Sequence, residues 1–175
     1  MVSLKDFVEE DKKTSDWDKL QVNLYKAHGA PEEIMYFINQ PNGKGHACER
    51  FARKKFPNLN NREGSGHDHV FHGKKAEQKT SALWKGKDFK WQHIEEKQDW
   101  DFLILSAIDY KEIRWYFLSK KKFNQIRRRK NNSPIKLQGK KGKSKEGYWF
   151  TFSKMETHLK SFKNARELKQ LVDNL

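Results

Sequence analysis

The chain of 175 residues contains a single cysteine, four prolines and no long hydrophobic run. One thiol, Cys48, excludes an intrachain disulfide framework and fits a reducing cytosol. No segment reaches the roughly 18 consecutive apolar residues that a membrane-spanning helix needs. The first ten residues include Asp6, Glu9 and Glu10 and lack the apolar stretch of a signal peptide. We therefore expect a cytoplasmic protein without a membrane partner.

Hydrophobic residues make up only 35% of the chain, but aromatic residues supply much of that fraction: twelve Phe, six Trp and five Tyr. Each buried aromatic side chain removes a large apolar area from water, so a core of ordinary size is feasible. The length fits one domain spanning residues 1–175.

Positive charge is abundant and unevenly distributed. The net charge is +14, and the segment from Lys120 to Lys145 carries twelve Lys or Arg and no Asp or Glu. Such a block favours a polyanion through phosphate contacts and counterion release. The alternative is a solvated basic loop without a role.

The N-terminal part predicts three helices. The first runs from Trp17 to about Ala27 after an Asp16 N-cap, and Gly29 ends it. The second follows Pro31, and the third runs from about Gly45 to Phe56 with an apolar stripe that includes Cys48 and Ala52.

The centre of the chain predicts a sheet. We expect a polar loop over 58–66, a hairpin over 68–72 and 75–82, a short helix over 89–96, a strand over 101–109 that is buried on both faces, and an antiparallel strand over 113–118. Beyond it we expect a helical or extended basic arm over 123–130, a hairpin of 135–138 with 148–152, and an amphipathic helix over 155–175. The fold class is thus α/β (α+β): a central mixed sheet flanked by helices, with a basic C-terminal hairpin and helix extension.

Asp68, Glu77 and Lys79 form the most informative motif. A turn at Gly73-Lys74 would pair His72 with Lys75 and set these three side chains on one face of the hairpin. Two carboxylates suit Mg²⁺, and a neighbouring ammonium can hold or polarise a water molecule.

This motif resembles the active site of the PD-(D/E)XK, or restriction-endonuclease-like, nucleases, although His67 stands where that family usually has Pro. The resemblance covers residues 43–119 as a nuclease core, with N-terminal helices over 1–42 and a basic DNA-binding extension and terminal helix over 120–175. It implies that Asp68, Glu77 and the Gln78 carbonyl bind Mg²⁺, with Mn²⁺ as a substitute, and that Lys79 is catalytic. It further implies a catalytic Glu49 on the preceding helix and a supporting Gln92 on the helix after the hairpin.

The function implied is a Mg²⁺-dependent endodeoxyribonuclease, most similar to a small type II restriction endonuclease that cuts double-stranded DNA as a homodimer in a bacterial, archaeal or phage-like setting. A nicking, Holliday-junction or repair nuclease of the same fold remains open, as does a nucleic-acid-binding protein without catalysis. The residues expected to contact DNA are Arg127, Arg128, Arg129, Lys130, Lys140, Lys141 and, at the rim of the cleft, His67.

Two histidine-based alternatives are weaker. His46, Cys48, His67, His69 and His72 could bind zinc, but their spacing lacks a zinc pattern. His69 is similar in position to the base of HNH nucleases, whose downstream Asn and His have no match here. We expect His69 to face the side of the sheet opposite Asp68.

Overall fold

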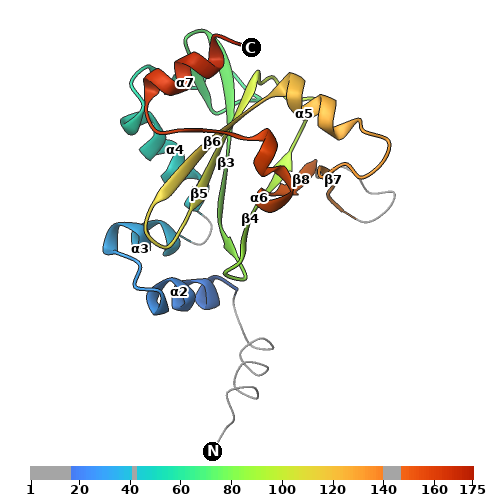
Figure 1. Cartoon of the computed structure of the whole chain (residues 1–175). Helices are drawn as coiled ribbons and strands as arrows, with labels where there is room; N and C mark the ends of the chain where they lie inside the picture. Colours follow the sequence, from blue (N-terminus) through green and yellow to red (C-terminus); the bar gives the residue numbers. More distant parts are fainter. Residues whose placement is uncertain (1–16, 41–42, 140–146) are drawn as a thin grey trace, which may run out of the picture.

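The computed structural model describes residues 17–40, 43–139 and 147–175. Three helices open the described chain: α2 (Trp17–Ala27), α3 (Glu32–Ile38) and α4 (Lys44–Lys55). All three agree with the sequence prediction, and the predicted N-cap Asp16 lies outside the described residues. In Figure 1, α2 and α3 lie at one end of the molecule, and α7 (Ala165–Val172) lies at the other.

Within the described ranges, nine strands form one mixed sheet in the order β7-β8-β4-β3-β5-β6-β9, with β2 and then β1 attached to the first part of β3. The central strands are β3 (Lys74–Trp84), β4 (Asp88–Ile94), β5 (Phe102–Ile108) and β6 (Ile113–Ser119). Strands β3 and β5 are parallel, and the other pairs are antiparallel. The short strands are β1 (Leu59–Asn61), β2 (His69–Phe71), β7 (Lys136–Leu137), β8 (Tyr148–Thr151) and β9 (Lys160–Phe162).

Strand β5 is buried along its whole length, as its apolar sequence predicts, and it separates two hydrophobic cores. Leu103 and Leu105 belong to the core that also contains the buried residues of α2, α3 and β4 and of helix α5 (Lys120–Arg127). Phe102 and Ile104 belong to the second core, with α4 and α7. The predicted mixed sheet flanked by helices is therefore confirmed.

Three local predictions are wrong. Residues 89–96, predicted as a helix, contain strand β4, in which Phe89 and Trp91 are buried and Lys90 and Gln92 are partly exposed. The predicted loop over 58–66 contains β1, because its Leu59 is buried in the second core. The predicted terminal helix over 155–175 is divided into α6 (Phe152–Met155), a 3₁₀ turn (Glu156–His158), β9 and α7.

The helix that the resemblance implied between the hairpin and the buried strand is thus a strand in this chain. Among the described residues, no helix is both long and apolar enough to cross a membrane.

Candidate active site

The β2–β3 hairpin holds the predicted carboxylates, but its turn is one residue earlier than expected. Phe71 pairs with Lys74 and His69 pairs with Ala76, so the turn residues are His72 and Gly73 rather than Gly73 and Lys74. Both have positive φ, 47° and 76°, as a type I′ turn requires. The predicted pairing of His72 with Lys75 is therefore wrong. Because the register differs by two residues, the alternation of faces is unchanged and Asp68, Glu77 and Lys79 still share a face.

Asp68 lies where the pairing of β2 with β3 stops. Its backbone N–H donates to the Ala76 carbonyl at 2.9 Å, and its Oδ2 accepts the Gln78 N–H at 2.8 Å. The carboxylate thus occupies the edge position that a further residue of β2 would otherwise fill. Strand β4 joins the same edge of β3 only at Leu83 and Trp84, so the edge near Gln78 opens as a gap between β2 and β4.

Glu77 is buried beside Asp68, with 6% of its surface exposed. Lys79 Nζ donates to Glu77 Oε1 at 2.6 Å. Burial raises the pKa of Glu77 to about 7; the Lys79 ammonium opposes this shift and the Asp68 carboxyl adds to it. When two carboxyl groups lie together in a partly buried position, ionisation of the second is unfavourable unless a cation compensates its charge. Lys79 supplies one positive charge, and the arrangement fits a further cation.

The oxygen atoms at this position suit a hard divalent metal. Asp68 and Glu77 contribute carboxylates. In a strand the N–H and C=O of one residue point to the same edge, so the Gln78 carbonyl points to the edge at which its N–H meets Asp68. Among the described residues, no group of three or more His, Cys, Asp or Glu side chains could hold a metal. A metal here would therefore bind two carboxylates and a carbonyl, with water completing the shell, as Mg²⁺ prefers.

The opposite face of the hairpin carries a buried polar network. His69 is fully buried, its Nε2 lies 2.8 Å from Gln78 Oε1, and its Nδ1 lies 3.3 Å from Arg53. Gln78 Nε2 donates to Ser106 Oγ at 3.3 Å. Burial lowers the pKa of His69. The expectation that His69 faces away from Asp68 agrees with this geometry, and the Gln78 side chain supports the hairpin.

The predicted position of His67 at the rim of the cleft is wrong. Its side chain is 3% exposed, and neither ring nitrogen has a hydrogen-bond partner among the described residues. The preceding Gly66 has φ +86°, and an added Cβ would lie 2.9 Å from the Asp99 backbone nitrogen. This close approach holds the loop before Asp68 against residue 99 and turns His67 inward, so His67 cannot contact DNA phosphate in this conformation.

Glu49 lies on α4, as predicted, and its carboxylate pairs with His46 of the same helix at 3.4 Å. Helix α4 packs on the side of the sheet that carries Thr80, because Cys48 contacts Thr80 and Ser106. Within the described part of the chain, no hydrogen bond or ion pair joins Glu49 to the Asp68–Glu77–Lys79 cluster. Burial also raises the pKa of the Cys48 thiol to about 11, which disfavours the thiolate that the zinc alternative requires.

Gln92 is on strand β4 rather than on a helix, and its Oε1 accepts from Gln138 Nε2 at 3.4 Å. It lines a groove together with Thr80 and Lys90. Sequence reasoning missed the basic residues of this groove because it placed residues 89–96 in a helix. The signal that could have found them is the alternation of apolar Phe89 and Trp91 with polar Lys90 and Gln92.

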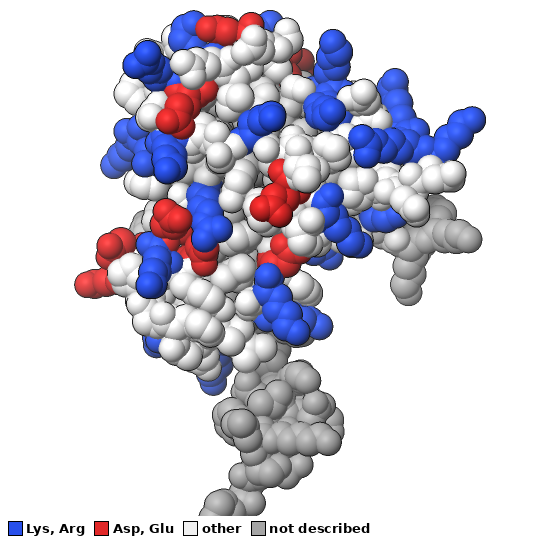
Figure 2. Space-filling view, in the orientation of Figure 1, with Lys and Arg blue, Asp and Glu red and all other residues white. Residues whose placement is uncertain are grey.

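The predicted DNA-binding arginines differ from one another. Arg127 is 15% exposed, forms an ion pair with Glu96, and donates to Tyr148 Oη at 3.0 Å, so it holds α5 against its neighbours. Arg128, Arg129 and Lys130 are exposed at the end of α5. Figure 2 shows Lys and Arg side chains gathered along the side of the molecule where α5 and β7 lie. Lys140 and Lys141 lie outside the described residues.

Comparisons with family models, with curated proteins and with solved structures return no match for this chain.

Proposed function

We propose that this protein is a Mg²⁺-dependent endodeoxyribonuclease whose active site consists of Asp68, Glu77, Lys79 and the Gln78 carbonyl. The single observation that supports this proposal most is the Asp68–Glu77–Lys79 cluster at the gap between β2 and β4. Glu77 is almost fully buried there, although charged residues are rarely buried without a compensating partner.

The residues would have distinct tasks. Asp68, whose Oδ2 is fixed by the Gln78 N–H, and Glu77 would bind the ion, which supplies charge neutralisation of a phosphodiester when bound. The Lys79 ammonium, 2.6 Å from Glu77, can donate a hydrogen bond to a water molecule or to a phosphate oxygen. The exposed basic side chains of α5 would hold the DNA backbone by charge.

The finer assignment is a site-specific restriction endonuclease. One copy of the site would cut one strand, so cutting both strands at one place calls for a symmetric dimer. A nickase, a junction-resolving nuclease and a repair nuclease are alternatives with the same chemistry.

The experiment is incubation of supercoiled plasmid with the protein in Mg²⁺, in Mn²⁺ and in EDTA. We expect cleavage with either metal and none in EDTA. Discrete linear fragments support the restriction assignment, and open circles support a nickase. Asp68→Asn and Glu77→Gln should abolish cleavage, whereas Asp99→Asn, which alters an exposed carboxylate paired with Lys75, should not. A lack of cleavage on every DNA substrate, with DNA binding intact, would contradict the proposal.

A further inference from the structure

The part of the sheet formed by β4, β8 and β7 has one face that is not packed into either core. In β4, Phe89 and Trp91 are buried in the first core, and Lys90 and Gln92 lie on the alternate, partly exposed face. Lys90 pairs with Thr151 of β8, and cross-strand partners share a face. Trp149, two residues from Thr151, therefore lies on the same face as Lys90.

Two tryptophans flank one lysine on this face. Lys90 Nζ lies 4.3 Å from the centre of the Trp149 ring and 5.6 Å from that of Trp84. Trp84 is 44% exposed, although large aromatic side chains are usually highly buried. Lys136 of β7 pairs with Trp149 and adds a second cation. We call Trp84, Lys90, Trp149 and Lys136 the tryptophan face.

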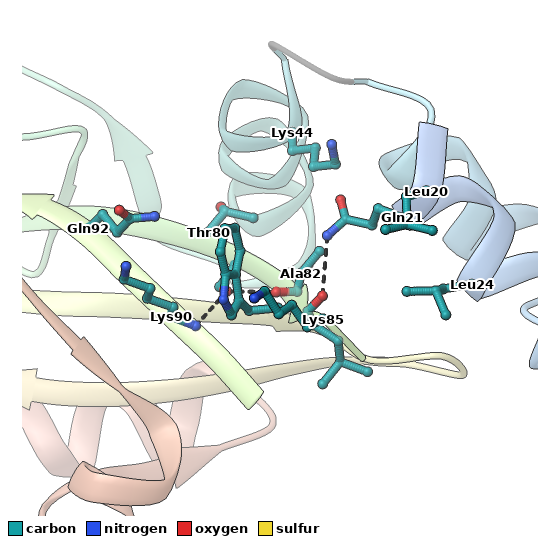
Figure 3. A pocket seen from close by; sticks show the side chains of 12 residues that line it. Leu20, Gln21, Leu24, Lys44, Thr80, Ala82, Lys85, Lys90 and Gln92 are labelled. Carbon is teal, nitrogen blue, oxygen red and sulfur yellow. Dashed lines mark hydrogen bonds between the residues drawn. The ribbon is translucent and has the colours of Figure 1, made fainter. Parts of the chain in front are cut away.

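A groove of about 230 Å³ adjoins the tryptophan face. Figure 3 shows Lys90 and Gln92 of β4 and Thr80 of β3 on one side of it, with Gln21 of α2 and Lys44 at the start of α4 on the other. Its lining includes three lysines, two glutamines and Trp84, and the described lining residues include no Asp or Glu. The groove thus offers hydrogen-bond donors and positive charge to an anionic, planar ligand.

Asp88 of β4 places a carboxylate beside the tryptophan face. Its Oδ2 accepts the Ser153 hydroxyl at 2.6 Å, and its Oδ1 accepts the Ser153 N–H at 3.2 Å. These hydrogen bonds tie Asp88 to the start of α6, and the two lysines of the face outnumber this one carboxylate.

The groove and the candidate active site share strand β3. Thr80 and Ser81 line the groove and directly follow Lys79. Thr80, however, projects from the face of β3 on which α4 packs, opposite to the face of Glu77 and Lys79. At about 3.3 Å per strand residue, the groove lies within roughly 10 Å of Lys79 along β3. A polynucleotide at the carboxylates would reach the tryptophan face by passing around the edge of β3 that is open between β2 and β4.

We propose that the tryptophan face binds unpaired DNA bases by stacking on Trp84 and Trp149, while Lys90 and Lys136 contact phosphates and the groove accepts one base. Exposed aromatic rings interspersed with cations bind single strands in this way, because every base has a flat face and every linkage has a charge. That the ligand is the DNA substrate rests on the proposed function, whereas the stacking surface stands on its own geometry.

The test is the fluorescence anisotropy of a labelled oligo-dT of about 12 nucleotides, a length typical of single-strand sites, measured in EDTA so that no cleavage occurs. Trp84→Ala and Trp149→Ala should each raise the Kd for oligo-dT about 5- to 150-fold, which corresponds to the loss of one stacked base. Trp149→Phe should recover most of the affinity, because phenylalanine keeps a ring for stacking.

The control is Tyr36→Ala, which removes an aromatic ring that is 52% exposed on α3; it should leave the Kd unchanged. A blunt duplex of the same length should be affected much less than oligo-dT by the tryptophan variants. Wild-type affinity in both tryptophan variants, or an equal loss for oligo-dT and duplex, would overturn the proposal. Tryptophan-dependent binding by a protein that never cleaves DNA would refute the proposed function alone.

Discussion

The substitution Glu77→Gln gives the sharpest test of how charge is compensated in the candidate site. Burial raises the pKa of Glu77 from its usual 4.5 to about 7. A group whose pKa is raised by folding stabilises the protein fully below its unfolded pKa, and this contribution is lost as the pH rises through the folded value. In metal-free protein, the loss therefore falls between about pH 4.5 and pH 7.

The expected magnitude follows from the same shift. At about 1.36 kcal/mol per pKa unit, it amounts to on the order of 3 kcal/mol. Wild type loses this stability as the pH rises through that range, whereas the amide side chain of Glu77→Gln cannot ionise. The free energy of unfolding of Glu77→Gln should therefore rise by this amount relative to that of wild type. For a chain of this length, that gain corresponds to about 6–12 °C in Tm.

The assay is thermal or urea unfolding of both proteins in EDTA, across and slightly beyond that pH range, with the difference in stability plotted against pH. Groups that titrate alike in both proteins contribute equally to both free energies of unfolding, so they do not affect the difference between them. The loss of the ion pair with Lys79 shifts the difference by a further amount. Glu63→Gln, which alters an exposed carboxylate, serves as the matched control for replacing a carboxyl group by an amide. A difference for Glu77→Gln that does not change with pH would contradict the raised pKa of Glu77, and a relative loss of stability with rising pH would show that Lys79 outweighs burial.

Further predictions concern the metal, α5 and the loop before Asp68. Mg²⁺ should raise the Tm of wild type above about pH 7 but not that of Asp68→Asn, as calorimetry with and without EDTA can show. Arg127→Ala should destabilise the fold by about 1–3 kcal/mol in urea unfolding, because it leaves the partly buried Glu96 and Tyr148 without their partner. Replacing Arg128 and Arg129 by Ala should instead leave stability unchanged and reduce the slope of log K against log salt by about 0.9 for each phosphate that is no longer neutralised. Gly66→Ala should cost more than about 1 kcal/mol in urea unfolding, because its Cβ would lie 2.9 Å from the Asp99 backbone nitrogen at a φ of +86°, whereas Gly64→Ala, at φ +104° with open space around it, should cost less.

The sequence predicted the elements whose pattern is local. Strand β5 is a continuous apolar run, and α4 has an apolar stripe that ends before Pro57, so both were found. The shared face of Asp68, Glu77 and Lys79 was also found despite the wrong turn. His72 accepts a positive φ, which allows a type I′ turn that the sequence did not distinguish from a turn one residue later.

Strand β4 was missed because its apolar spacing is interrupted. His93 has a φ of 56°, and the pairing with β8 shifts between Trp91 and Ile94, which brings Ile94 to a buried position. Trp91 and Ile94 are therefore three residues apart, a spacing that imitates a helix.

The end of the chain was misjudged for a tertiary reason and for a missed local signal. Phe162 pairs with Trp115 at the edge of the sheet, a pairing that no local pattern reveals. The local signal was an N-cap: Asn164 Oδ1 accepts the Glu167 N–H at 2.9 Å, and Glu167 Oε2 accepts the N–H of Lys163, the residue before the cap, at 2.7 Å. This motif begins α7 at Ala165 and would have separated it from the preceding residues.

The most direct test of the central claim compares plasmid cleavage by Lys79→Gln and Lys75→Gln in Mg²⁺. Both lysines project from the same face of β3 and each pairs with an acid, Lys79 with Glu77 and Lys75 with Asp99. We expect that Lys79→Gln loses cleavage while it still binds DNA, and that Lys75→Gln cleaves at the wild-type rate. Cleavage by Lys79→Gln at the wild-type rate would contradict the assignment of this site.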